Sequence, residues 1–147
     1  KEKFVELCVD ADIDGLIVPD LPYEEYDELK PLLDETNVYM IPLVALTSED
    51  RIPMLVKESK GFVYCVSSLG VTGVRKEFDT RIDSFVAKVK EATDTPACIG
   101  FGISTKADVE RFDKIADGCI VGSAIVRKIF DSKMNIDEIK AFVSSLK

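Results

Sequence analysis

The stretch VYCVSSLGVTGVR, residues 63–75, runs from a β-branched and aromatic segment directly into a loop bracketed by two glycines. The first part has the composition of a buried strand. The Gly-Val-Thr-Gly that follows could be a tight turn, a flexible hinge or a backbone cradle for an anion. The rest of the chain decides among these three interpretations.

Five apolar segments have this strand-like character. All are continuous rather than alternating, which is typical of parallel strands covered on both faces. Amphipathic segments separate them, and in RIDSFVAKVKEA four apolar side chains share one helical face: Ile82, Phe85, Val86 and Val89. The expected strands are 15–20, 38–46, 62–68, 97–103 and 119–125, and the expected helices are 23–36, 48–59, 78–92, 104–116 and 135–147.

Prolines and polar residues indicate how some of these helices begin. Pro31 and Pro53 lie inside two helical segments, so we expect those helices to start late or to split into two turns. Ser104 and Asn135 are the expected N-caps of two later helices.

Strands and helices alternate along the whole chain, and the strand starts are roughly 22 to 35 residues apart, the size of βα units. This order predicts an α/β fold with a parallel sheet, either an open doubly wound sheet or part of a (β/α)₈ barrel. No linker interrupts it, so residues 1–147 are expected to form a single domain. The chain opens with KEKFVELCVDAD, without Met and with the pattern of a helix interior. We therefore expect it to be part of a longer natural protein.

Composition excludes several classes of function. The chain has 147 residues, 46% of them hydrophobic, which is enough for one globular core. No apolar run approaches the ~20 residues that cross a bilayer, and no signal peptide opens the chain, so we expect a soluble cytoplasmic protein without a membrane partner. A net charge of −8 argues against a nucleic-acid partner.

The four cysteines, Cys8, Cys65, Cys98 and Cys119, have no CxxC spacing. A metal site or disulfides remain alternatives, but buried reduced thiols are the expectation for such a chain. There is no histidine, which removes the commonest metal ligand and the commonest general base. No metal is expected.

Three glycine-containing loops follow the last three expected strands: 68–73, 100–104 and 121–125. In a barrel, ligands bind at this end of the strands, and a phosphate is typically held by the loops after strands 7 and 8. Gly102, Gly122 and Ser123 would present backbone N–H groups there, with the Ser123 hydroxyl as a further donor. Any one loop could be a plain turn, but three at consecutive strand ends favour a phosphate site. No dinucleotide or P-loop motif is present.

These residues resemble one family closely, the α subunit of tryptophan synthase. The resemblance rests on DGLIVPDLPYEE (14–25), YCVSSLGVTGVR (64–75), PACIGFGISTKADV (96–109) and DGCIVGSAIVRKI (117–129), and it covers essentially the whole chain. It implies a (β/α)₈ TIM barrel, present here as strands 4–8 with their helices. It also implies a lyase of tryptophan biosynthesis that cleaves indole-3-glycerol phosphate to indole and glyceraldehyde 3-phosphate.

The resemblance also implies roles for individual residues. The phosphate-contacting positions would be Gly73, Gly102, Gly122 and Ser123. Tyr64 and Phe101 would line the indole and glycerol part of the site, and Thr72 would help to order the catalytic carboxylate. Asp20 and Pro22 would face the β subunit of an α₂β₂ complex. Pyridoxal phosphate would belong to that β partner, so this chain would need no cofactor of its own.

The chain departs from the family pattern in one respect. The family's catalytic Glu and Asp lie on the early strands, N-terminal to everything in this sequence, so no catalytic residue can be assigned here. We therefore expect the chain alone to bind phosphate but to lack lyase turnover. Two alternatives stay open: an inactive half-barrel that self-associates through its exposed sheet, or another phosphate-binding barrel enzyme such as a thiamine phosphate synthase.

Overall fold

The computed structural model describes residues 1–67 and 81–147. Its strands pair in parallel in two sheets. A two-stranded sheet joins β1 (Gly15–Leu16) to β2 (Tyr39–Met40). A four-stranded sheet has the order β3-β4-β5-β6, made of β3 (Leu43–Ala45), β4 (Val63–Val66), β5 (Ala97–Gly100) and β6 (Gly118–Ile120).

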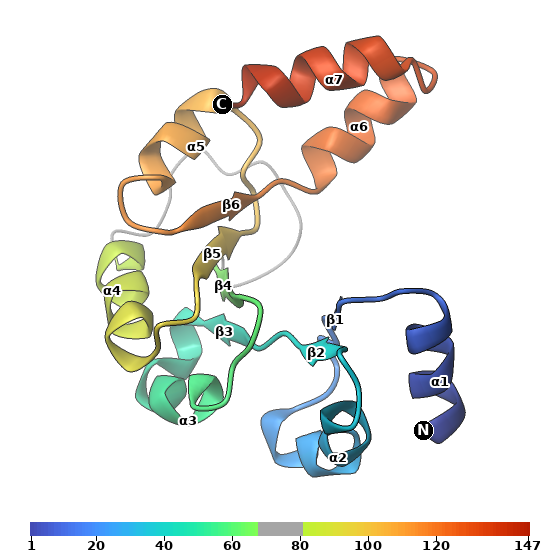
Figure 1. The fold of residues 1–147 in the computed structure, drawn as a ribbon. Coiled ribbons are helices and arrows are strands. Elements are labelled where there is room, and N and C mark those ends of the chain that lie inside the picture. Colours follow the sequence, from blue (N-terminus) through green and yellow to red (C-terminus); the bar gives the residue numbers. More distant parts are fainter. Residues whose placement is uncertain (68–80) are drawn as a thin grey trace.

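Helices connect successive strands. In chain order these are α1 (Glu2–Asp10), η1 (Tyr23–Glu28), α2 (Lys30–Asp34), η2 (Leu46–Arg51), α3 (Ile52–Val56), α4 (Ile82–Ala92), α5 (Lys106–Phe112), α6 (Ser123–Asp131) and α7 (Ile136–Ser145), where η marks a 3₁₀ helix. Figure 1 shows the strands as an arc with α3, α4 and α5 on its outer side, and α6 and α7 paired at its C-terminal end. This arrangement is a partial βα barrel, as the sequence predicted.

The expected strand 38–46 is two short strands, because its pairing partner changes at Pro42. The Ile41 N–H donates to the Leu16 carbonyl at 2.9 Å, so the first half pairs with β1. The Pro42 carbonyl accepts from the Tyr64 N–H at 2.9 Å, so the second half pairs with β4. Proline has no N–H to continue a ladder. One extended segment therefore links the two sheets.

The larger core lies between the four-stranded sheet and its outer helices. The predicted face of α4 is confirmed, because its four apolar side chains are all fully buried: Ile82, Phe85, Val86 and Val89. They belong to the same cluster as Val63, Cys65 and Ile99 of the sheet. Burial of each large side chain contributes about 1.5–3 kcal/mol. A second, smaller core joins α1 to α2 and contains Val5, Cys8, Leu29, Leu33 and Val38.

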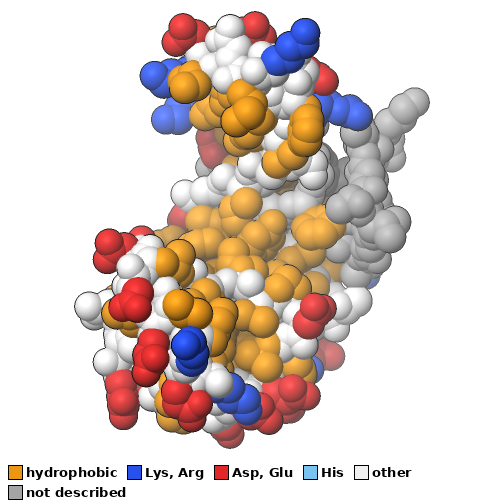
Figure 2. Space-filling model, turned by 90° about the vertical axis from the view of Figure 1, so that its right-hand side faces the viewer, with side chains coloured by type: hydrophobic (Ala, Val, Ile, Leu, Met, Phe, Trp, Pro, Cys, Tyr) orange, Lys and Arg blue, Asp and Glu red, His pale blue; other side chains and the backbone are white. Residues whose placement is uncertain are grey.

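The inner face of the sheet is only partly buried. Along β4, Val63 and Cys65 are buried toward the helices, whereas Tyr64 and Val66 alternate to the other face and are half-buried. Figure 2 views the molecule toward this hollow side and shows hydrophobic side chains gathered across it. The expectation of strands covered on both faces is therefore wrong for the described residues, which cover one face. The apolar composition of these strands is nevertheless that of a sheet covered on both faces.

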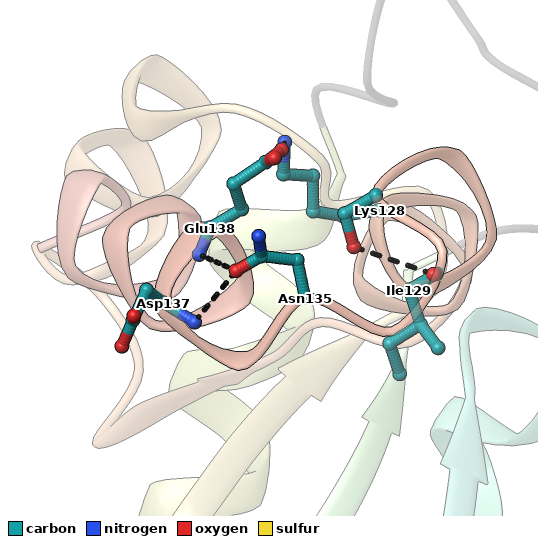
Figure 3. Close-up of polar contacts among 6 residues, drawn as sticks. Lys128, Ile129, Asn135, Asp137 and Glu138 are labelled. Carbon is teal, nitrogen blue, oxygen red and sulfur yellow. Dashed lines mark hydrogen bonds and ion pairs between the residues drawn. The ribbon is translucent and has the colours of Figure 1, made fainter.

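Helix starts follow the predicted rules in most cases. The segments that contain Pro31 and Pro53 are each split, into η1 with α2 and into η2 with α3, and each proline lies in the first turn of the second helix. Asn135 caps α7 as predicted: its side-chain oxygen accepts from the N–H groups of Asp137 and Glu138 (Figure 3).

The expected cap at Ser104 is wrong by one residue. Thr105 is the N-cap of α5, and it forms a capping box with Asp108. Its hydroxyl accepts from the Asp108 N–H at 3.2 Å, while the Asp108 carboxylate accepts from the Thr105 N–H at 2.8 Å. Ser104 also donates its N–H to that carboxylate, at 3.0 Å. The preference of an acidic residue for the third helical position selects Thr105 over Ser104.

The four cysteines are free thiols: Cys8 and Cys65 are buried, as expected, whereas Cys98 and Cys119 are only half-buried. Burial raises the pKa of Cys65 to about 12 and that of Cys119 to about 11. Within residues 1–67 and 81–147, no helix is long and apolar enough to cross a membrane.

Candidate phosphate-binding site

The site is at the edge of the sheet where β4, β5 and β6 end. These strands are neighbours and parallel, so the loops that follow them leave the sheet on the same side. Thr72 and Gly73 belong to the loop after β4 and lie outside the described residues. The site can therefore be built from the loops after β5 and β6.

The loop after β5 has an unusual backbone. Gly102 has φ +84°, in the left-handed region that favours glycine. Phe101, just before it, has φ +86°. A non-glycine residue held there costs about 1–3 kcal/mol and persists only where its surroundings enforce it. The Phe101 side chain is 38% exposed, which leaves its ring available beside the site.

Ser67, the residue after β4, holds this loop. It is the only buried polar side chain in the part of the chain that the structure describes, with 4% exposure. Its hydroxyl lies 2.7 Å from the Gly100 carbonyl and 2.7 Å from the Phe101 carbonyl. Sequence reasoning missed Ser67, because it counted this serine as part of the expected strand 62–68, whereas β4 ends at Val66.

The loop after β6 leads into an uncapped helix. Gly122 is the N-cap of α6 and Ser123 is its first residue. Among the described residues no side chain caps this end, and no acidic residue occupies the first turn, in contrast to the capped starts of α5 and α7. The N–H groups of a helix's first turn have no partners within the helix, and its dipole favours an anion there by about 0.3–1 kcal/mol.

Both glycines leave the backbone open to approach. Among the described residues, a Cβ added to Gly102 or to Gly122 would meet no atom within 4 Å. Side-chain packing therefore does not require glycine at either position. Gly122 has φ −106°, so a positive φ accounts for glycine at Gly102 and not at Gly122. Glycine at Gly122 leaves space in front of the N–H groups of α6.

Tyr64 connects the inner face of the sheet to this edge. Its ring lies over Gly100, the residue before Phe101, so the two aromatic residues predicted to line the site are brought to the same loop. Burial raises the pKa of the Tyr64 phenol, so it stays neutral at physiological pH and acts as a hydrogen-bonding group.

The other predicted positions lie further along the arc. Asp20 and Pro22 follow the carboxyl end of β1, and both are exposed.

A cavity of about 1000 Å³ lies between α2 and α3, but none of its lining residues belongs to the loops after β5 and β6. Its rim charges are partly paired, for example Lys30 with Glu58 at 3.2 Å. No group of metal-ligating side chains occurs within the described ranges.

Comparison with known proteins identifies one family. The family model described as "Tryptophan synthase alpha chain" matches residues 1–147. The tryptophan synthase alpha chain of Bacillus thuringiensis (strain Al Hakam) is 49% identical over 148 residues, which cover 100% of this chain and 57% of that protein. The alpha chain of Bacillus velezensis is 51% identical over 136 residues, 92% of this chain and 51% of that protein.

Solved structures give the same result. The tryptophan synthase alpha subunit of Campylobacter jejuni superposes with a TM-score of 0.82 at 35% identity, over 99% of this chain and 58% of that one. A Mycobacterium tuberculosis tryptophan synthase chain superposes with a TM-score of 0.84 at 31% identity, over 99% and 55%. The chain thus spans a little over half the length of the relatives it matches. It belongs to the tryptophan synthase alpha chain family.

Proposed function

We propose that this chain supplies the phosphate-binding half of a site that cleaves indole-3-glycerol phosphate to indole and glyceraldehyde 3-phosphate. The phosphate is held between the Gly102 N–H and the start of α6, where Gly122 and Ser123 present their N–H groups and the Ser123 hydroxyl. The observation that carries this proposal is the pair of open glycine positions on adjacent loops, one of them at an uncapped helix start. The family membership of the chain supports the choice of substrate.

We propose that the chemistry uses groups beyond those of this chain. Retro-aldol cleavage needs an acid that protonates the indole ring carbon and a base that takes a proton from the glycerol hydroxyl. Ser67 is the only buried polar side chain of the described residues, and its hydroxyl is already directed at carbonyls. We propose that the acid and the base belong to the part of the relatives' length that this chain does not span. Alone, the chain would bind phosphate without turnover.

The partner proposed for the complete assembly is a tryptophan synthase β subunit. Asp20 and Pro22 are exposed at the carboxyl end of β1, where a partner could reach them. We propose that this chain uses no cofactor of its own and that pyridoxal phosphate belongs to the β subunit. Its proposed location is the cytoplasm.

The direct test uses glycerol 3-phosphate, which carries the glycerol phosphate part of the proposed substrate. Gly122→Asp places a negative charge where the phosphate is expected, while Gly122→Asn adds nearly the same bulk without charge. Both residues are good N-caps, so α6 is retained in each variant. We expect Asp to weaken binding at least about tenfold more than Asn, by like-charge repulsion. Equal affinity of the two variants in calorimetry would contradict the site.

A second candidate function has one observation in its favour. The half-buried inner face of β4 and β5 is suited to pack against another apolar surface, so the chain could be an inactive module that self-associates. Binding of glycerol 3-phosphate that is sensitive to Gly122→Asp separates the two, since a purely structural module has no reason to respond to that charge.

A further inference from the structure

The carbonyl of Phe101 has one hydrogen-bond partner among the described residues, the hydroxyl of Ser67 at 2.7 Å. That hydroxyl also lies 2.7 Å from the Gly100 carbonyl, so its single hydrogen is shared between two acceptors. The Gly100 carbonyl has a second donor, the backbone N–H of Ser67 at 3.0 Å. The Ser67 side chain is therefore dispensable for the pairing of β4 with β5, but not for the position of the Phe101 carbonyl.

This contact fixes the direction of the next N–H group. In a planar trans peptide the carbonyl of one residue and the N–H of the next point in opposite directions. Because the Phe101 carbonyl points to Ser67, which follows β4, the Gly102 N–H points away from β4. The sheet order places β6 on the other side of β5, and β6 leads to Gly122 and Ser123.

The backbone of Phe101 would not hold this direction unaided. Its φ of +86° is unfavourable for a residue with a side chain, and an extended backbone would turn the following peptide elsewhere. The hydrogen bond from Ser67 to the Phe101 carbonyl opposes that relaxation, since breaking it would leave this carbonyl without its donor among the described residues.

We propose that Ser67 is a positioning residue of the phosphate site: its hydroxyl holds the Phe101–Gly102 peptide so that the Gly102 N–H faces the start of α6. This inference rests on the proposed function, because it assigns the Gly102 N–H to the phosphate. Ser67 itself does not touch the ligand.

The test compares three variants of the full chain by NMR titration with glycerol 3-phosphate. Ser67→Ala removes the hydroxyl, and Ser67→Thr keeps it. Ser59→Ala is the matched control, because the Ser59 hydroxyl also donates to a carbonyl, that of Val56 at 2.8 Å, but in the loop before β4, at the amino ends of the strands. The readouts are the affinity, the shift of the Gly102 amide on titration, and the Phe101 backbone carbon shifts, which report its left-handed φ without any ligand.

We expect Ser67→Ala to weaken binding about tenfold, as for the loss of one buried hydrogen bond, and to move the Phe101 carbon shifts away from left-handed values. Ser67→Thr should retain both properties, and Ser59→Ala should match the parent chain. If Ser67→Ala does not fold, Ser67→Cys keeps the volume with a weaker donor and should show the same changes.

The outcomes distinguish the positioning role of Ser67 from the proposed phosphate-binding function. Unchanged Phe101 shifts in Ser67→Ala would overturn the positioning role, as would a Ser67→Thr variant that binds as weakly as Ser67→Ala. Failure of the parent chain to bind glycerol 3-phosphate would instead refute the proposed function, and the Phe101 shifts would still decide whether Ser67 holds the peptide.

Discussion

The ring of Tyr64 on β4 lies directly over the Cα of Gly100 at the end of β5. A Cβ on Gly100 would come within 2.6 Å of the Tyr64 Cζ and closer still to its hydroxyl. The two residues are diagonal neighbours on the inner face, since Tyr64 pairs with Cys98 and Val66 with Gly100. Glycine at position 100 is therefore required by an aromatic neighbour, and the pair sets where the loop to Phe101 begins.

Gly100→Ala should destabilise the fold by about 1–3 kcal/mol, the usual cost of overpacking. Replacing Tyr64 by Ala in the same chain removes the obstructing ring, so the second alanine should cost less than it does alone. Urea unfolding of the two single variants and the double variant measures this coupling. Additive losses would contradict the contact.

The N-cap of α7, Asn135, is a second local feature that can be tested. Its side chain accepts from the N–H groups of Asp137 and Glu138 (Figure 3), and these two hydrogen bonds are 3.1 and 3.2 Å long. Asn135→Ala should lower the free energy of unfolding by about 1 kcal/mol, whereas Asn135→Asp should be nearly neutral. The nearby ion pair of Lys128 with Glu138 is exposed, so Lys128→Ala should cost less than the cap. Chemical denaturation of the three variants gives the ranking.

Much of the architecture could be predicted from local pattern. The alternation of strands and helices, the buried face of α4 and the splits at Pro31 and Pro53 follow from period and backbone chemistry that act within a few residues. The glycine loops could be placed at the correct strand ends for the same reason.

What could not be predicted depends on contacts between segments far apart in the sequence. The break at Pro42 arises because one segment pairs with two different strands. The role of Ser67 depends on two carbonyls 33 and 34 residues further on. The left-handed φ of Phe101 is unfavourable for a residue with a side chain and is imposed by neighbouring residues, so no local rule predicts it.

Asp108 should make the stability of α5 depend on pH in the acid range. Burial raises the pKa of its carboxyl, but the hydrogen bonds from Ser104 and Thr105 outweigh that effect and lower the pKa overall. A lowered folded pKa means that the contribution is present above the unfolded value, about 3.9, and is lost as pH falls through the folded pKa. Asp108→Asn should therefore show a smaller loss of stability between about pH 5 and pH 2. Identical pH profiles would contradict the capping box.

The cysteine thiols offer a test of burial. With a pKa of about 12, Cys65 would be thiolate to the extent of roughly one molecule in ten thousand at pH 8, against about a quarter for a free cysteine. Alkylation of Cys65 and Cys119 by iodoacetamide should be slow in the native chain and fast in urea, as followed by peptide mass. Equal rates in both conditions would show that these thiols are accessible.

The uncovered inner face predicts that the chain associates with itself. The outer strands of the arc, β1 and β6, also each have one edge without a partner strand among the described residues. We expect sedimentation velocity to show association that increases with concentration.

Val66→Lys places a charge on the half-buried inner face and should weaken this association, whereas Met54→Lys on α3 is a control, because Met54 is exposed among the outer helices. If both variants and the parent chain sediment as compact monomers at every concentration, the inner face is not an interface between copies. If Val66→Lys alone is monomeric and still binds glycerol 3-phosphate, association and phosphate binding use separate surfaces of one chain.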